Sequence, residues 1–136
     1  MTTTYPISAA YADGQVLSAS NVNQIAGGVN DLAALQINAQ TANYTLVLGD
    51  AAKLVTMTAS TGTLTLTIPQ NSSVAFAIGT QVLVYQGGSI QVTIAGTGSA
   101  VVRSQGTKTK TAGQYAVVCV TKIATDEWVL FGNTST

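Results

Sequence analysis

The sequence contains no histidine and one cysteine, and only 7% of its 136 residues are charged. Without histidine, the chain cannot use an imidazole as a general base or as a metal ligand. Cys119 alone can form neither an intrachain disulfide nor a cluster of thiolate ligands. Because globular proteins usually carry about 25% charged residues, neutral polar groups must cover much of this surface. Ser, Thr, Asn and Gln supply 48 residues, and threonine alone occurs 21 times.

Charge and hydropathy exclude further classes of partner. Five basic and five acidic residues give zero net charge, so nothing favours nucleic acid electrostatically. No apolar run approaches the roughly 18 residues of a membrane span. Residues 1–14 lack the basic and apolar regions of a secretory signal. Because a free protein with so little charge would be poorly soluble, we expect a chain held in an assembly, with no nucleic-acid or membrane partner.

Residues 1–17 are expected to form an extended arm. Pro6 is incompatible with a helix interior, and Asp13-Gly14 is a turn signal. A frayed terminus is the alternative for residues 1–10. Apolar and aromatic side chains occur at irregular spacings, as in a segment that lies against another surface: Tyr5, Ile7, Tyr11, Val16 and Leu17.

Residues 18–42 predict one short helix. Ser18 or Ser20 can cap its start. Gly27-Gly28 weakens it by about 1 kcal/mol per glycine relative to alanine, so the helix is marginal in water by itself. It needs a partner, either its own β module or the same helix in other subunits; the latter is favoured because the rest of the chain supplies its own core. Apolar residues follow the three- and four-residue spacing of a heptad seam, and Gln36 and Ala39 continue the phase: Val22, Ile25, Val29 and Leu32.

Residues 43–136 predict an all-β module. Segments rich in β-branched and aromatic residues recur about every ten residues between turn residues. This spacing is typical of a small antiparallel β-sandwich or a jelly-roll-like module. The expected strands are Tyr44–Leu48, Lys53–Thr58, Thr63–Ile68, Val74–Ile78, Gln81–Gln86, Ile90–Ala95, Ala100–Arg103, Tyr115–Ile123 and Glu127–Phe131.

The strand patterns distinguish outer from central positions. Leu64, Leu66 and Ile68 alternate with threonines, which predicts a half-buried strand with a neutral polar outer face. Residues 82–85 and 117–120 are instead apolar on both faces, so they belong at the centre of a sheet or between a sheet and a neighbouring subunit. Because few charges are available to protect strand edges, the edges must close on themselves or be covered by other subunits. These two observations also favour an oligomer.

Two stretches resemble parts of tailed-bacteriophage virion proteins. Residues 11–23, Tyr-Ala-Asp-Gly-Gln-Val-Leu-Ser-Ala-Ser-Asn-Val-Asn, resemble a DGQVLTAADLN segment found near the N-termini of many such proteins. The β zone is similar to a small module of phage tail-fibre and head-decoration proteins, through Tyr44–Asp50, Asn71–Gln81 and Glu127–Gly132 in the same order. Together they cover about three quarters of the chain, and neither is a catalytic motif.

The resemblance implies a non-enzymatic virion surface protein, usually a homotrimer, with its N-terminal part on the particle and its β module outward. One arm, one helix and one β module look like a capsid decoration protein, a minor capsid protein or short head fibre. Such a protein would bind the major capsid protein on the capsid exterior after assembly in the host cytoplasm. The alternative is a tail-fibre or receptor-binding knob that binds tail proteins and contacts host surface glycans.

This interpretation assigns roles to the apolar residues of the N-terminal zones. Aromatic and apolar anchors carry most of the binding energy of an interface. The expected trimer interface consists of Val22, Ile25, Val29 and Leu32. The expected particle attachment consists of Tyr5, Ile7, Tyr11, Val16 and Leu17.

The sequence offers no convincing catalytic or cofactor site. Asp126 and Glu127 are adjacent, so in a strand they point to opposite faces and cannot act as a carboxylate pair. Gly87-Gly88 and residues 96–98 predict hairpin turns, because no helix or lysine follows them as in a phosphate loop. We expect no enzyme activity, no metal and no cofactor.

Three aromatic residues are candidate glycan contacts in the tail-fibre alternative, because aromatic rings stack on sugars: Tyr85, Tyr115 and Trp128. For Trp128, packing in the core near the end of the chain is the favoured interpretation. Cys119 is expected to be a small buried hydrophobe.

Overall fold

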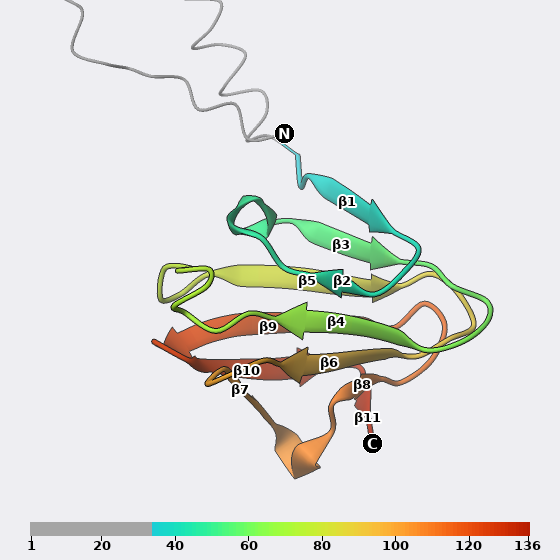
Figure 1. Ribbon diagram of the computed structural model, residues 1–136. Helices are drawn as coiled ribbons and strands as arrows, with labels where there is room; N and C mark the ends of the chain where they lie inside the picture. Colours follow the sequence, from blue (N-terminus) through green and yellow to red (C-terminus); the bar gives the residue numbers. More distant parts are fainter. Residues whose placement is uncertain (1–33) are drawn as a thin grey trace, which may run out of the picture. The chain divides into compact units, whose positions relative to one another are not determined.

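Eleven strands and two 3-10 turns make up the regular structure of residues 34–136, the part of the chain that the computed structural model describes (Figure 1). The β module runs from Ile37 to Thr136. Its strands are β1 (Ile37–Gln40), β2 (Tyr44–Thr45), β3 (Leu54–Met57), β4 (Leu64–Ile68), β5 (Gln81–Gln86), β6 (Val92–Gly96), β7 (Val101–Ser104), β8 (Lys110–Thr111), β9 (Val117–Ala124), β10 (Glu127–Gly132) and β11 (Thr134–Ser135). The 3-10 turns are η1 (Leu48–Asp50) and η2 (Gln105–Thr107).

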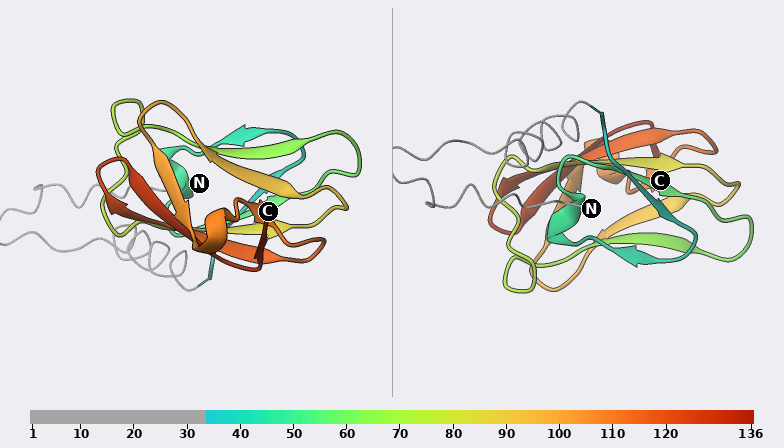
Figure 2. Two further views of the ribbon diagram at one scale, coloured as in Figure 1. Left: turned by 90° about the horizontal axis from the view of Figure 1, so that it is seen from below. Right: turned by 90° about the horizontal axis from the view of Figure 1, so that it is seen from above.

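The strands form two sheets that face each other across one core (Figure 2). The six-stranded sheet has the order β1-β3-β5-β9-β10-β7, and the five-stranded sheet has the order β11-β8-β6-β4-β2. From β1 to β6 the chain alternates between the sheets, so that β1, β3 and β5 stack in parallel in one sheet and β2, β4 and β6 in the other. Each pair of strands is therefore one coil of a short solenoid-like stack.

The stack ends where the chain changes direction. The antiparallel hairpin β9–β10 lies between β5 and β7 in the six-stranded sheet. In the five-stranded sheet, β8 pairs antiparallel with both β6 and β11. The C-terminal part of the chain thus closes the sheet that the parallel coils began.

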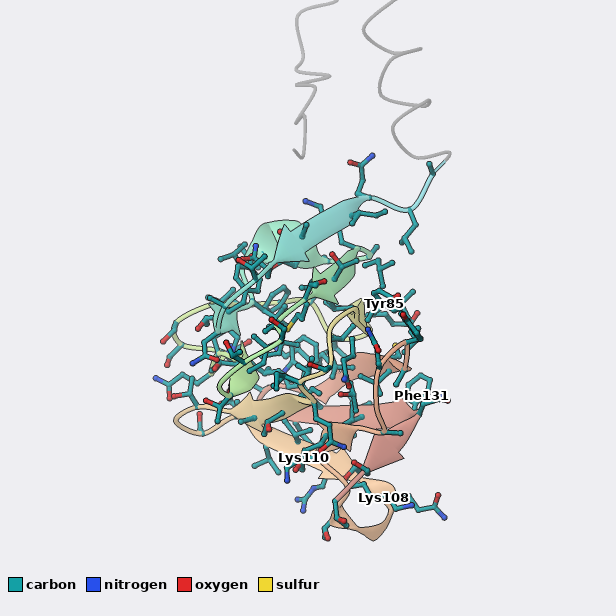
Figure 3. All side chains as sticks on the ribbon, turned by 90° about the vertical axis from the view of Figure 1, so that its right-hand side faces the viewer. Tyr85, Lys108, Lys110 and Phe131 are labelled. Carbon is teal, nitrogen blue, oxygen red and sulfur yellow. The ribbon has the colours of Figure 1, made fainter. Side chains whose placement is uncertain are left out.

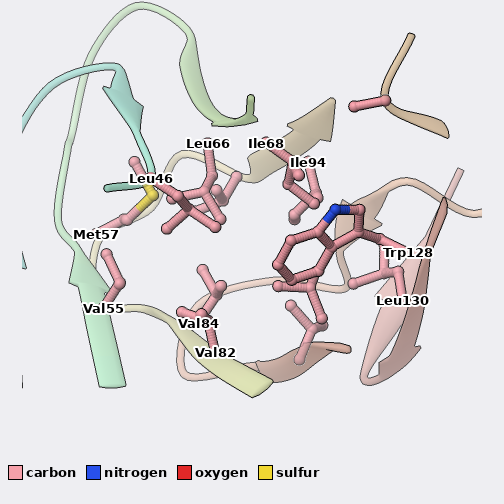
Figure 4. Close-up of a cluster of buried hydrophobic side chains, with 14 of the residues drawn as sticks. Leu46, Val55, Met57, Leu66, Ile68, Val82, Val84, Ile94, Trp128 and Leu130 are labelled. Atoms are coloured by element: carbon pink, nitrogen blue, oxygen red, sulfur yellow. The ribbon is translucent and has the colours of Figure 1, made fainter. Parts of the chain in front are cut away.

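The core forms because apolar residues on both sheets recur with the two-residue period of a strand. The five residues of β4 alternate between buried leucine or isoleucine and half-buried threonine. Trp128 is 1% exposed, and its ring meets the ring of Phe76 edge to face at 5.4 Å. Figure 4 shows the cluster, which includes Leu46, Val55, Met57, Leu66, Ile68, Val82, Val84, Ile94, Trp128 and Leu130.

The all-β expectation is confirmed, and most expected strands are present with small changes at their ends. Residues 81–86 match the expectation at both ends. The antiparallel sandwich or jelly roll is not confirmed, since five of the nine strand pairs in the described residues are parallel. Alternating hydropathy reports which face of a strand is buried but not the direction of its neighbour, so the sequence could not distinguish these arrangements.

Two expected elements are wrong. The helix expected over 18–42 cannot extend to residue 42, because Ile37–Gln40 is strand β1, which pairs with β3. Residues 18–33 of the expected helix lie outside the described residues. The β module begins at Ile37 rather than at residue 43. Val74–Ile78 is a loop instead of a strand. Its turn is held by two backbone N–H groups, of Ser73 and Val74, that donate to the carbonyl oxygen of Gln70.

Candidate assembly surface

The outer face of the six-stranded sheet is unusually apolar. Register places Ile37 opposite Leu54, Leu54 opposite Leu83, Leu83 opposite Cys119, and Cys119 opposite Phe131. These five residues, the apolar row, cross five neighbouring strands without a polar side chain. Their strand neighbours in the sequence point inward, so the row lies on the side of the sheet away from the core.

The lines on either side of the row are of mixed character. Ala39, Thr56, Tyr85 and Val117 form one adjoining line, with threonine as its single polar aliphatic member. Gln81, Thr121 and Val129 form the other, which is more polar. Figure 3 shows Tyr85 and Phe131 projecting on the same side of the module. The most exposed apolar side chains of this face are Ile37 (65%), Phe131 (50%), Ile123 (49%), Val101 (42%) and Val117 (41%).

Charge is confined to one margin of the face. Arg103 on β7 and Glu127 on β10 form an ion pair with 2.8 Å between Nε and Oε1. Both side chains are well exposed, so the pair adds little to stability. Its effect is to leave this margin without net charge.

The outer face of the five-stranded sheet has the opposite character. Thr65 on β4 lies opposite Thr93 on β6, and Thr93 lies opposite Lys110 on β8. In the next line, Thr45 lies opposite Thr67. These threonines present hydroxyl groups to solvent from a pleated surface that suits β-branched residues. The two sheets share a core but offer solvent a threonine face and an apolar face.

None of the residues expected to mediate assembly is among the described residues. Those of the trimer interface, Val22, Ile25, Val29 and Leu32, and those of the particle attachment, Tyr5, Ile7, Tyr11, Val16 and Leu17, lie outside the described residues. The apolar row was missed as a site. A signal for part of it existed, because residues 82–85 and 117–120 read as apolar on both faces, and β5 and β9 are indeed central.

The candidate glycan contacts lie in different environments. The prediction of Trp128 as a possible glycan contact is wrong, because its side chain is in the core against Phe76. Tyr85 is half-buried on the outer face of the six-stranded sheet. Tyr115 precedes β9, is 67% exposed and has a φ of 72°, a left-handed conformation that is strained for a bulky side chain.

Cys119 confirms the expectation of a small buried hydrophobe. Its side chain points to the outer face, since Val118 and Val120 on either side are in the core. It is nevertheless only 7% exposed. Leu83 and Phe131, its partners in the apolar row, flank it on both sides.

Asp50 holds the first coil of the stack together. Its carboxylate is 1% exposed and accepts hydrogen bonds from Asn38 Nδ2 (2.8 Å), the Tyr44 hydroxyl (2.8 Å) and the Val47 backbone N–H (2.9 Å). These donors come from β1, β2 and the residue before η1. Burial, together with the bond to Asp50, raises the pKa of Tyr44 above its ordinary value of 10.0. The network thus provides hydrogen-bond donors for both oxygen atoms of a buried carboxyl group.

A second polar network fixes the loop between β4 and β5. Lys122 is 2% exposed, and its Nζ donates to Asn71 Oδ1 (2.5 Å) and to the Phe76 carbonyl oxygen (2.8 Å). Asp126 accepts hydrogen bonds from the Asn71 backbone N–H (2.6 Å) and the Ser99 hydroxyl (2.7 Å). Asp126 is thus engaged in fastening two loops to the turn between β9 and β10.

Asp126 should make stability depend on acid pH. The Asn71 N–H, the Ser99 hydroxyl and the charge of Lys122 hold the pKa of this carboxyl below its ordinary value of 3.8. Its contribution is therefore complete above the ordinary value and is lost as pH falls through the folded-state pKa. Urea unfolding at several values from about pH 6 to about pH 2 should show a falling midpoint below about pH 4. Asp126→Asn should flatten this fall, and an unchanged pH profile in that variant would contradict the assignment.

The described residues contain no group of three or more His, Cys, Asp or Glu side chains placed to hold a metal ion. Within the same part of the chain, no helix is both long and apolar enough to cross a membrane.

Comparison with known proteins finds no relative of this chain. No family model, no curated protein and no solved structure matches the chain.

Proposed function

We propose that this chain is a non-enzymatic structural protein of a bacteriophage virion, a homotrimer that decorates the capsid. It docks on the major capsid protein through its N-terminal region and stabilises the particle. The observation that carries the proposal is the uncharged apolar row on the outer face of a fully formed sheet. Monomeric soluble proteins rarely expose large contiguous apolar patches, so a face of this kind is suited to being covered in an assembly.

The sequence supports the viral assignment independently, through the resemblance of residues 11–23 and of the three blocks in the β zone to phage virion proteins. The proposed action is mechanical. A protein that binds only the assembled shell stabilises that shell by mass action, without chemistry. The polar networks of Asp50 and Asp126 agree with this, because each carboxylate is occupied by hydrogen bonds within the module.

Substitutions in the arm test the docking. Leu17→Asp and Tyr11→Ala should each weaken binding to undecorated particles by at least about 30-fold, because loss of one central anchor typically costs about 2 kcal/mol or more. The measurement is co-sedimentation of the full chain with particles over a range of concentrations. The near-ultraviolet circular dichroism of Trp128 should stay unchanged, since that residue is buried in the β module.

Thr3→Ala is the matched control in the same segment, and it should bind as the unsubstituted chain does. Full particle occupancy by Leu17→Asp protein would remove the docking proposal. Gold labelling in the same experiment locates the bound protein, and label on the tail with none on the head would replace the capsid assignment with the tail-fibre alternative.

One observation favours that alternative, a tail-fibre or receptor-binding knob. Tyr115 is a large, exposed aromatic residue in a left-handed conformation, and strained residues are often found at ligand sites. Tyr85 lies near Tyr115, because it pairs with Val117, which follows Tyr115 by two residues. A sugar ring could stack on Tyr115, but the pair offers no charged or amide side chain that would fix its hydroxyl groups.

A further inference from the structure

We propose that the apolar row is a homotypic contact, which packs against the same surface of the other copies in the homotrimer. This inference rests on the proposed function for the existence of the trimer, and it adds which surface of the β module the subunits share. The outer face of the six-stranded sheet then lies toward the common axis, and the threonine face of the other sheet lies toward solvent.

The size of the surface fits a contact between protein subunits. Five strands about 4.8 Å apart span about 19 Å between the first and the last strand axis, and strands of four to eight residues are about 13 to 26 Å long. Such a face offers several hundred square ångströms, the same order as the roughly 800 Å² per partner that a standard interface buries. Ile37 and Phe131 are half-exposed or more in the single chain, so burial of these two side chains remains to be gained. Leu54 and Leu83 are already partly buried.

The charge pattern fits a second copy of the chain. A surface that meets itself must not place like charges together. The apolar row has no charged member, and Arg103 and Glu127 at the margin neutralise each other. A membrane surface would instead favour unpaired basic residues around the apolar side chains, and the single arginine of this face is already paired.

The position of Cys119 agrees with this arrangement. The thiol at the centre of the row is only 7% exposed in the single chain, because Leu83 and Phe131 flank it on both sides. Small ligands bind in concave pockets that include a few polar groups to fix their orientation, and the row has no polar side chain. The face therefore fits a second β module better than a small ligand.

The test introduces a charge on each face in turn. Phe131→Glu and Ile37→Glu alter exposed members of the apolar row, so the single chain can accommodate them. Thr93→Glu is the matched control on the threonine face, where it lies opposite Lys110. Sedimentation equilibrium of the full chain measures the concentration at which half of the trimer, about 41 kDa or three times 13.8 kDa, has dissociated.

The row variants should raise that concentration by at least about 100-fold, because an unpaired charge would be buried in the interface, and Thr93→Glu should change it less than about 3-fold. If the unsubstituted chain is a trimer and the row variants dissociate no more readily than Thr93→Glu, this inference is overturned while the proposed function stands. If the unsubstituted chain is monomeric, both the contact and the homotrimer are wrong. If the row variants dissociate but still decorate particles at high concentration, the contact is supported independently of docking.

Discussion

Trp128→Ala should lower the free energy of unfolding by about 3–5 kcal/mol, the usual cost of deleting a fully buried large aromatic side chain. The indole fills the space between β10 and the loop that carries Phe76, and the edge-to-face contact of the two rings would be lost with it. Because single domains are stable by only about 5–15 kcal/mol, this is a large fraction of the total.

Urea unfolding followed by far-ultraviolet circular dichroism measures the effect of Trp128→Ala. Tyr115→Ala is the matched control, since it removes an aromatic ring that is 67% exposed and should change stability by less than about 0.5 kcal/mol. Equal destabilisation by the two substitutions would contradict the assignment of Trp128 to the core. The same result would reopen Trp128 as a surface residue for glycan binding.

Asp50→Ala should destabilise the β module by about 2–4 kcal/mol, because it leaves the Asn38 amide, the Tyr44 hydroxyl and the Val47 N–H without their shared acceptor. Each unsatisfied buried polar group costs about 1–3 kcal/mol, and water can reach the partly buried members. The loss should be concentrated in β1 and β2, the strands that these donors tie to η1. Hydrogen exchange should therefore speed up first in residues 37–47.

Tyr44→Phe is the control for Asp50→Ala, because it removes only the two hydrogen bonds of the Tyr44 hydroxyl, the one it donates to Asp50 and the one it accepts from Asn38, and keeps the ring that packs on the core. Its cost should be about 1 kcal/mol. If Asp50→Ala melts like the unsubstituted chain, or if exchange quickens in β9 and β10 before β1, the network does not hold the first coil.

Local pattern was sufficient to predict the inner faces of the strands. Leu64, Leu66 and Ile68 are buried as their alternation required, and the doubly apolar β5 and β9 are central. The direction of the pairing was not predictable, because parallel and antiparallel neighbours impose the same two-residue period on a half-buried strand. The parallel and antiparallel arrangements differ in how the chain connects the strands, and here the chain returns to the first sheet after each coil.

The errors have local physical causes. The heptad phase carried Gln36 and Ala39 into the expected helix, but pairing with Leu54–Met57 makes Ile37–Gln40 a strand, an example of tertiary contacts overriding local periodicity. Val74–Ile78 has the composition of a strand but is held as a loop by Lys122, whose Nζ donates to the Phe76 carbonyl oxygen. That contact joins residues 46 positions apart in the sequence.

The apolar row could not be read from the sequence as a surface. Ile37, Leu54, Leu83, Cys119 and Phe131 are separated by between 12 and 36 positions, and only the register of four strand pairs aligns them. Each residue taken singly looks like ordinary core. The distinction between an inner and an outer apolar side chain becomes visible only when the opposite face of the same strand is known.

The position of the β9–β10 hairpin between β5 and β7 has a consequence for biosynthesis. A ribosome delivers β7 well before residues 117–132, so β7 has no neighbour in its sheet until β10 has emerged. Contacts between such distant segments slow folding and leave strands unpaired in the meantime. The six-stranded sheet can therefore be completed only after β9 and β10 are made, and β5 and β7 need protection from premature association until then.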